Sequence, residues 1–233
     1  MLQKKLIIFD FDGVIYDVST LQMQRIINSA QSALECSTDK GILPHEKFLK
    51  AYWGMSITEM SQLFVDKLNW TLDQAKLFLD YEKNNNGFFP NGLASGYNEL
   101  ILKLKNAGIN VAICSNRYTH SFYPLIKKLQ IPKKDFEFII LGDTLKNGVK
   151  KPDKRVLDPV FIKYNKEEIV LIGDTLRSDF QTAVNANIDF IGISSILHSQ
   201  HDFTRKFKTH VNGSTFLVLN EFKQLSEVLD TKY

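Results

Sequence analysis

The chain has 233 residues, of which 44% are hydrophobic and 24% are charged, enough for one well-packed domain with a modest second module. Its net charge of +3 is weak and its Lys and Arg residues are dispersed, which argues against nucleic acid as the main partner. The N-terminus lacks a signal-peptide pattern, no apolar stretch approaches the roughly 20 residues of a membrane span, and two cysteines are too few for a disulfide framework, so we predict a cytoplasmic protein.

Short apolar runs along the chain predict the strands of a parallel β-sheet, because strands covered on both faces are continuously apolar. These runs are Leu6–Phe9, Ile109–Cys114, Phe138–Leu141, Ile169–Ile172, Ile188–Ile193 and Phe216–Leu219. Helical patterns lie between several of them, at Ala94–Ala107, Asp153–Tyr164 and Ser178–Ala186. This alternation predicts an α/β fold with a Rossmann-like, doubly wound parallel sheet.

The segment from about Val18 to Gly87 breaks this rhythm, because its apolar residues keep helical spacing throughout. It is far longer than a crossover between parallel strands needs, and it ends on the strong breaker sequence Asn-Asn-Asn-Gly. Ordinary crossover helices are the simpler interpretation. We instead predict a catalytic core of residues 1–17 and 88–233 and an inserted α-helical cap domain of residues 18–87.

Polar residues that follow the predicted strands mark the functional edge of the sheet. In open α/β sheets, ligands bind beyond the carboxyl ends of the strands. We therefore expect the polar residues there to meet at one edge, although they are far apart in the chain. They are Asp10, Asp12 and Gly13, then Ser115 and Asn116, then Lys151, and finally Asp174 and Asp179.

The acidic residues of this set predict a magnesium site. Side chains alternate along an extended segment, so Asp10 and Asp12 are expected to point the same way. Neighbouring carboxylates repel one another unless a cation neutralises them. With Asp174 and Asp179 added, the site is rich in oxygen ligands and has no nearby His or Cys cluster, which favours Mg²⁺ over zinc. The predicted metal ligands are Asp10, Asp12, Asp174 and Asp179.

The remaining residues of the set predict a phosphate site beside the metal. Mg²⁺ and the Lys151 ammonium would attract a dianionic phosphate. The side chains of Ser115 and Asn116 can donate hydrogen bonds to its oxygens. Gly13, which has no side chain, lets backbone N–H groups approach the phosphate closely.

Two carboxylates beside a phosphate predict covalent catalysis. A carboxylate can attack phosphorus to form an aspartyl-phosphate, while a second carboxylate handles the proton. We assign Asp10 as the nucleophile. Asp12 is assigned as the acid that protonates the leaving oxygen and as the base that later activates water.

Four stretches of the chain, FDFDGV, ICSNR, KKPD and IGDTLRSD, resemble in order and spacing the motifs of the haloacid dehalogenase (HAD) superfamily. The helical insert is similar to the cap of phosphoglycolate phosphatase-like members, so the resemblance covers nearly the whole chain. It implies a phosphatase that acts through an aspartyl-phosphate on a small phosphorylated metabolite.

Carried over residue by residue, the resemblance implies that Asp10 and Asp174 ligate Mg²⁺ through their side chains, and Asp12 through its main-chain carbonyl. Ser115 and Lys151 would bind phosphate. A carboxylate at the position of Asp12 is a phosphotransferase feature that dehalogenating members lack, so the resemblance favours phosphate chemistry.

Departures from the family pattern keep alternatives open. Val14 follows Gly13 where threonine is common, a form also seen in sugar-phosphate mutases, so a phosphomutase of the β-phosphoglucomutase type is the first alternative. A catalytically silent binding or regulatory protein is the second. Ser178 stands where many relatives place a second acid, which leaves the role of Asp179 as a direct ligand open. The substrate (phosphoglycolate-, sugar-phosphate- or nucleotide-like) and the choice between monomer and homodimer also stay open.

Overall fold

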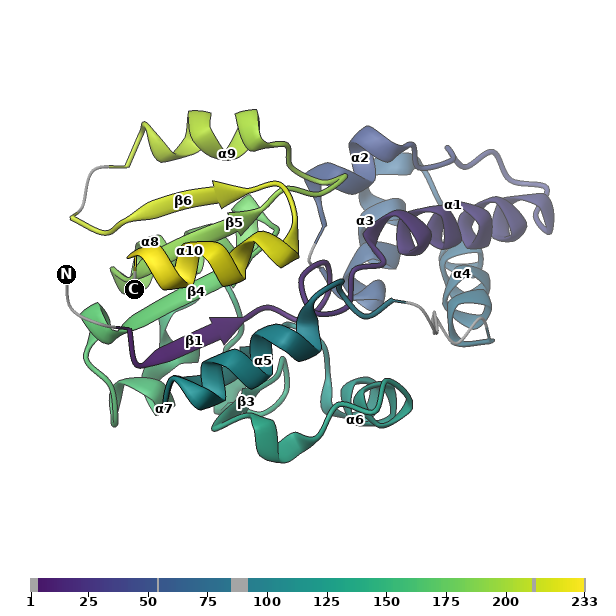
Figure 1. Cartoon of the computed structure of the whole chain (residues 1–233). Helices are drawn as coiled ribbons and strands as arrows, with labels where there is room; N and C mark the ends of the chain where they lie inside the picture. The colour runs from purple at the N-terminus through teal and green to yellow at the C-terminus, as the bar shows by residue number, and fades with distance from the viewer. Residues whose placement is uncertain (1–3, 54, 85–91, 211–212, 233) are drawn as a thin grey trace. The chain divides into compact units, whose positions relative to one another are not determined.

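The computed structural model of the protein describes residues 4–53, 55–84, 92–210 and 213–232. The chain divides into two compact units (Figure 1). The core unit comprises Met1–Asp17 and Pro90–Tyr233, and the helical unit comprises Val18–Phe89. The domain boundary that the sequence predicts, between residues 87 and 88, lies outside the described residues.

The core unit is built on six parallel strands, which confirms the predicted α/β fold (Figure 1). Their order in the sheet is β3-β2-β1-β4-β5-β6. This order reverses direction between β1 and β4, which makes their shared end the switch point where doubly wound sheets bind ligands. The strands are β1 (Leu6–Phe9), β2 (Asn110–Cys114), β3 (Phe138–Ile140), β4 (Ile169–Gly173), β5 (Asp189–Ile193) and β6 (Phe216–Leu219).

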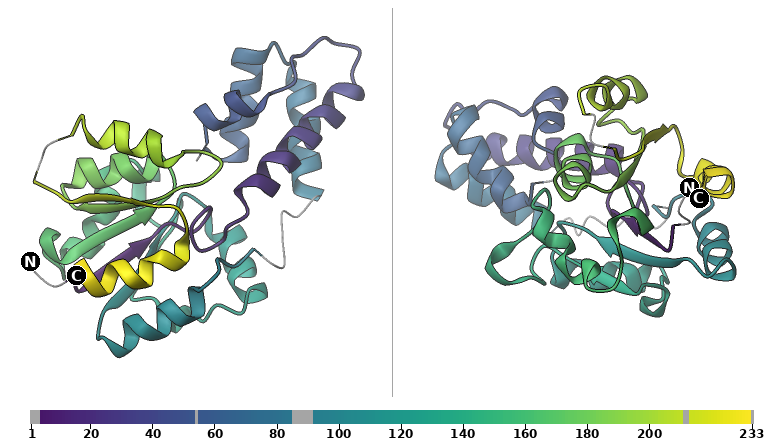
Figure 2. Two further views of the ribbon diagram at one scale, coloured as in Figure 1. Left: turned by 45° about the horizontal axis from the view of Figure 1, so that its top comes forward. Right: turned by 90° about the vertical axis from the view of Figure 1, so that its left-hand side faces the viewer.

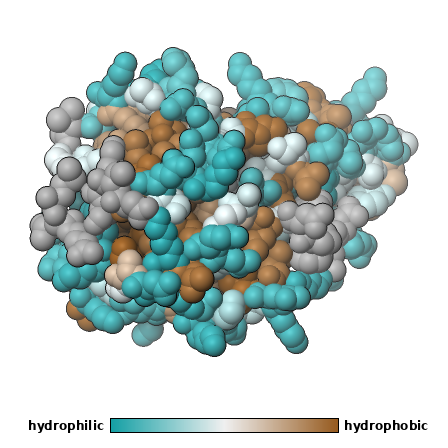
Figure 3. Space-filling model, viewed as in Figure 1, coloured by the Kyte–Doolittle hydropathy of each residue, from teal (hydrophilic) through white to brown (hydrophobic). Residues whose placement is uncertain are grey.

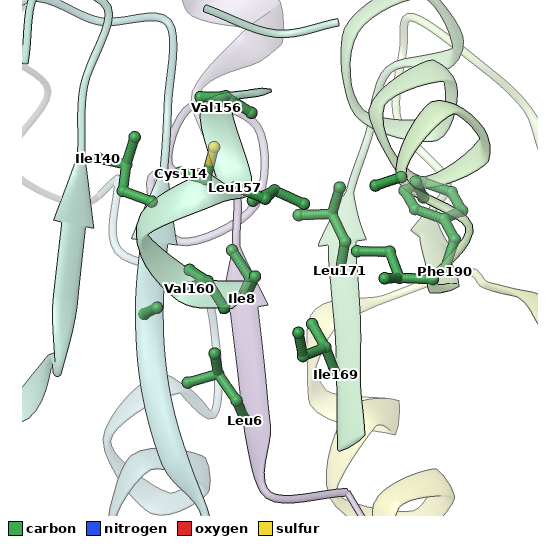
Figure 4. Close-up of a cluster of buried hydrophobic side chains, with 14 of the residues drawn as sticks. Leu6, Ile8, Cys114, Ile140, Val156, Leu157, Val160, Ile169, Leu171 and Phe190 are labelled. Carbon is green, nitrogen blue, oxygen red and sulfur yellow. The ribbon is translucent and has the colours of Figure 1, made fainter. Parts of the chain in front are cut away.

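Helices cover both faces of this sheet (Figure 2). Because side chains alternate along a strand, successive residues of each strand face opposite layers. Leu6 and Ile8 of β1 belong to a buried cluster with Val160 and Leu171 (Figure 4). On the other face, the rings of Phe9 and Phe222 lie 5.9 Å apart. Burying a large apolar side chain stabilises the fold by about 1.5–3 kcal/mol, so the central strands are firmly held.

The helices of the core unit differ in detail from their sequence patterns. The pattern at 153–164 forms a 3₁₀ turn, η3 (Lys154–Leu157), and then α7 (Asp158–Phe161). Pro159 lies in the first turn of α7 and has no N–H to donate, which explains why the helical bonding restarts there. The other core helices are α5 (Tyr97–Asn106), α6 (Thr119–Lys128), α8 (Gln181–Ala186), α9 (Gln200–Phe207) and α10 (Leu225–Lys232).

Within its described residues, the helical unit contains helices and no strand, as predicted. Its own aromatic core joins three segments: the ring of Phe64 lies 4.9 Å from that of Trp70 and 5.2 Å from that of Phe78. A unit with its own core can remain compact by itself. Its helices are α1 (Ser19–Glu35), α2 (Glu46–Ala51), α3 (Ile57–Leu68) and α4 (Leu72–Asn84).

The surface carries scattered apolar residues among polar ones. Hydrophilic side chains cover much of the face seen in Figure 3, with apolar residues between them. Among the residues that the structure describes, every helix is too short or too polar to be a membrane span. The exposed large apolar residues lie on several different elements: Leu21, Ile42, Leu43, Leu72, Leu102, Tyr118 and Ile162.

Candidate active site

The switch point of the sheet brings two acidic residues together from distant parts of the chain. Asp10 follows β1, and Asp174 follows the neighbouring strand β4. The Asp10 N–H donates a hydrogen bond to the Ile172 carbonyl at 2.8 Å, which continues the pairing of these strands by one residue. The ends of β1 and β4 therefore place both carboxyl groups at the same edge of the sheet.

Three buried carboxylates gather at this edge beside one lysine. Oxygens of Asp10, Asp174 and Asp179 all lie within 4.8 Å of one another. The ammonium of Lys151 lies 2.8 Å from Asp10 Oδ1 and 2.5 Å from Asp179 Oδ1, and it is buried as well. Three ionised carboxylates and one ammonium leave two negative charges, which is the charge that one divalent cation would balance.

Burial and mutual repulsion perturb the ionisation of these groups. Burial, followed by the charge of Asp179, raises the pKa of Asp10 to about 7, although Lys151 opposes the shift. The same two causes raise the pKa of Asp174 well above its ordinary value. Burial lowers the pKa of Lys151, but Asp10 and Asp179 outweigh this effect and raise it. One ammonium is therefore too little positive charge for this cluster.

The donor set fits an oxygen-ligated divalent cation. Among the described residues, neither carboxylate oxygen of Asp174 has a hydrogen-bond partner at normal distance, although Ser195 lies near enough to oppose its pKa shift. A buried carboxylate without donors is costly, and a cation would remove that cost. Asp179 is better satisfied, because Oδ1 contacts Lys151 and Oδ2 accepts from the Thr175 N–H at 3.0 Å.

A wide turn brings Asp179 into the cluster. Leu176–Phe180 forms a π-helical turn, η5, which starts at Thr175 and precedes α8. The Thr175 hydroxyl donates to Asp179 Oδ2 at 2.6 Å and fixes the carboxylate. A Cβ on Gly173 would lie 2.2 Å from the Cβ of Asp179, so only glycine leaves room for this approach.

Gly13 makes similar room for Asp174. It has a φ of +83°, a conformation that favours glycine, and a Cβ there would lie 2.2 Å from Asp174 Oδ2. Backbone hydrogen bonds close the loop around it: Gly13 N–H donates to the Tyr16 carbonyl, and Tyr16 N–H to the Phe11 carbonyl, both at 2.8 Å. The observed role of Gly13 is close approach, and its part in phosphate binding stays a prediction.

The residues after β2 lie beside the same cluster. Ser115 is buried, and its N–H donates to the Ile140 carbonyl at 2.9 Å. The Asn116 amide holds the main chain of Lys151: it donates to the Lys151 carbonyl at 3.0 Å and accepts from the Lys151 N–H at 2.9 Å. Asn116 therefore positions Lys151. The assignment of Ser115 and Asn116 to phosphate binding stays a prediction.

The side chain of Asp12 has a different partner from that of Asp10. Arg117 donates from Nε to Asp12 Oδ2 at 3.0 Å and from Nη2 to Oδ1 at 2.6 Å. β1 ends at Phe9, so Asp12 lies beyond the extended strand, and the expectation that Asp10 and Asp12 point the same way stays a prediction. The sequence analysis did not assign Arg117, although a cation two residues after Ser115 at an acidic edge was a usable signal.

Comparison with known proteins agrees with this geometry. Residues 7–193 match the family described as haloacid dehalogenase-like hydrolases, a span that covers most of the chain. The chain belongs to this family. The match confirms the predicted superfamily and the prediction that the protein is a hydrolase.

Individual relatives of this HAD-family chain are similar over most of their length. A phosphoglycolate phosphatase of Psychrobacter arcticus is 28% identical over 208 residues, covering 83% of this chain and 84% of the relative. A structure described as a predicted phosphoglycolate phosphatase from Haemophilus somnus has a TM-score of 0.73 at 21% identity, covering 98% and 99% of the two chains. A β-phosphoglucomutase from Clostridium difficile has a TM-score of 0.70 at 18% identity and covers 98% of each chain. The two structural likenesses show the fold.

The close approach of Gly13 to Asp174 predicts a severe effect of Gly13→Ala. Gly108 is a matched control, because it has a φ of +71° and a Cβ there would meet nothing within 4 Å. Gly108→Ala should lower the free energy of unfolding by about 1–2 kcal/mol, from backbone strain alone. Gly13→Ala should lower it further in urea unfolding, since Asp174 must also move. Equal losses in the two variants would contradict the role given to Gly13.

The raised pKa of Asp10 predicts that the metal-free HAD protein loses stability as pH rises. Asp10 releases its proton near its ordinary value of 3.8 in the unfolded chain but only near 7 in the folded protein. Between these values the folded state binds more protons, so the free energy of unfolding should fall with increasing pH. Urea unfolding in a chelator from pH 4 to 8 measures this.

Asp174→Asn should flatten that pH dependence, because it removes one buried charge that lacks hydrogen-bond donors among the described residues. At pH 7 in a chelator we expect the variant to be more stable than the unsubstituted protein, by on the order of 1 kcal/mol, the energy of one pKa unit. A less stable variant would show that the carboxylates do not repel one another appreciably.

Proposed function

We propose that the protein is a Mg²⁺-dependent phosphatase that hydrolyses a small phosphorylated metabolite through an aspartyl-phosphate. The observation that carries this proposal is the buried cluster of Asp10, Asp174 and Asp179, which keeps two negative charges after pairing with Lys151. Membership of a hydrolase family and the similarity to a phosphoglycolate phosphatase support the same chemistry. A phosphoglycolate-like or sugar-phosphate-like substrate is the narrowest class that these relatives suggest.

The metal would be held by Asp10 and Asp174 through their carboxylates and, as the family resemblance implies, by the main-chain carbonyl of Asp12. Asp179 lies close enough to take part. Oxygen ligands alone favour Mg²⁺ over softer metals. When bound, such an ion supplies positive charge that offsets the carboxylates and stabilises the charge of the transferring phosphoryl group.

In the first half-reaction, a carboxylate oxygen of Asp10 attacks phosphorus and forms a P–O bond. The bond from phosphorus to the leaving oxygen breaks, and Asp12 donates a proton to that oxygen. Lys151, buried beside Asp10, and Ser115 would hold the phosphate oxygens and stabilise their charge.

The second half-reaction hydrolyses the aspartyl-phosphate. Asp12, now a carboxylate, accepts a proton from water as the water oxygen attacks phosphorus. The bond between phosphorus and Asp10 breaks, so that inorganic phosphate leaves and both carboxyl groups return to their starting states. Phosphatase and mutase chemistry differ only in whether water or a sugar hydroxyl attacks here.

The proposal gives the helical unit the role of a cap that recognises the leaving group. The unit begins at Val18, directly after the loop that carries Asp10 and Asp12, so it is linked to the site through a short stretch of chain. The cytoplasmic location and the choice between monomer and homodimer stay predictions.

Asp10→Asn should abolish turnover and leave the fold intact, because the amide is a poor nucleophile of nearly the same shape. We expect kcat to fall by a factor on the order of 10³ or more. The midpoint of thermal unfolding in a chelator should not fall, since a repelling charge is removed. Asp80→Asn, at an exposed position on α4, is the matched control and should keep full activity. Retained activity in Asp10→Asn would overturn the nucleophile assignment.

A substrate panel tests the proposed activity itself. Phosphoglycolate, sugar phosphates and nucleoside monophosphates should be assayed for phosphate release with Mg²⁺ and with a chelator. We expect release from at least one small phosphomonoester, and its loss in the chelator. Conversion of a sugar phosphate to its isomer without phosphate release would favour the mutase, to which the β-phosphoglucomutase-like fold and Val14 point. No turnover with any substrate would support a silent binding protein.

A further inference from the structure

The ion pair between Arg117 and Asp12 has no role in the chemistry described so far. Two guanidinium nitrogens contact both carboxylate oxygens, at 3.0 and 2.6 Å. The side chains are 21% and 25% exposed, so the pair is largely shielded from solvent. This forked geometry fixes the orientation of a carboxylate as well as its charge.

The main chain holds Arg117 firmly in place. Its N–H donates to Ser115 Oγ at 3.2 Å, and its carbonyl accepts from the Gly142 N–H at 2.9 Å. The loops after β2 and β3 are tightly packed there, because a Cβ on Gly142 would lie 2.5 Å from the Asn116 carbonyl oxygen. The guanidinium is therefore presented from an ordered loop, although its partner lies 105 residues away in the chain.

The two cations of the site serve different acids. Lys151 contacts Asp10 and Asp179 within the buried cluster. Arg117 contacts Asp12, whose carboxylate does not belong to the described metal-ligating group of Asp10, Asp174 and Asp179. Asp12 follows β1 by three residues, in a loop rather than a strand, so its backbone alone does not fix where the carboxylate points. Arg117 supplies that constraint.

We propose that Arg117 is a positioning residue that orients the carboxyl group of Asp12, so that the proton which Asp12 carries in the first half-reaction is directed to the leaving oxygen. The inference rests on the proposed phosphatase function. Proton transfer needs a fixed geometry between donor and acceptor, so a freely rotating Asp12 would be a poor acid even when it carries a proton. The planar fork of arginine provides this orientation, whereas lysine offers only a point charge.

The test uses two substrates that differ in their need for an acid. For an alkyl phosphate, the leaving oxygen must be protonated, and Arg117→Gln should lower kcat/KM about tenfold or more. For p-nitrophenyl phosphate, whose leaving group departs as a stable anion, kcat/KM should stay within about twofold, because this constant reports only steps up to the departure of the leaving group. Arg117→Lys should recover part of the loss.

A double-variant cycle identifies the residue through which Arg117 acts. In an Asp12→Asn background, Arg117→Gln should have an additional effect on the alkyl phosphate of less than about twofold. Arg205→Gln, an exposed arginine paired with Asp202, is the matched control and should change neither substrate. The shift in thermal unfolding midpoint on adding Mg²⁺ should be the same in Arg117→Gln as in the unsubstituted protein.

Three outcomes would overturn the inference. An equal loss with both substrates and a lowered unfolding midpoint would show a merely structural arginine. A raised KM that persists in the Asp12→Asn background would show that Arg117 contacts the substrate. Unchanged kcat/KM for the alkyl phosphate would show that Asp12 needs no such support. Failure of the proposed function itself is distinguishable, because the unsubstituted protein would then hydrolyse neither substrate with Mg²⁺.

Discussion

The contact of one buried ammonium with two buried carboxylates organises the candidate site. Lys151 lies between Asp10 and Asp179, and the nearby Asp174 leaves this largely buried group with excess negative charge. Such a cluster lowers the stability of the fold unless a further cation joins it. This excess of negative charge is the physical basis of the proposed metal site and of the proposed phosphate chemistry.

The rest of the core unit can be understood as support for that cluster. The reversal of strand order between β1 and β4 creates the place where Asp10 and Asp174 meet. Glycines at 13 and 173 allow carboxylates to come closer than any side chain would permit. The Asn116 amide fixes the main chain of Lys151 through two hydrogen bonds. These features bring like charges close together or restrict the main chain, and both effects are unfavourable. A sheet edge with a purely structural role would not need them.

The two cations of the candidate site, Lys151 and Arg117, contact different carboxylates. Lys151 contacts Asp10 and Asp179, the proposed nucleophile and a proposed metal ligand, where negative charge is concentrated. Arg117 contacts Asp12, whose direction matters in the proposed mechanism because its proton goes to one atom. The proposed mechanism gives different tasks to these two carboxylates, and each of them contacts a different kind of cation.

The sequence by itself determined the strands, their parallel arrangement, the helical insert and the acids at the strand ends, because these depend on local periodicity and on residue type. Asn187 ends α8 in the left-handed conformation that asparagine tolerates, which is also a local property. Only the tertiary structure decided which cation holds which acid. Arg117 and Asp12 are far apart in the chain, and their pairing depends on how two loops pack, which no local pattern records.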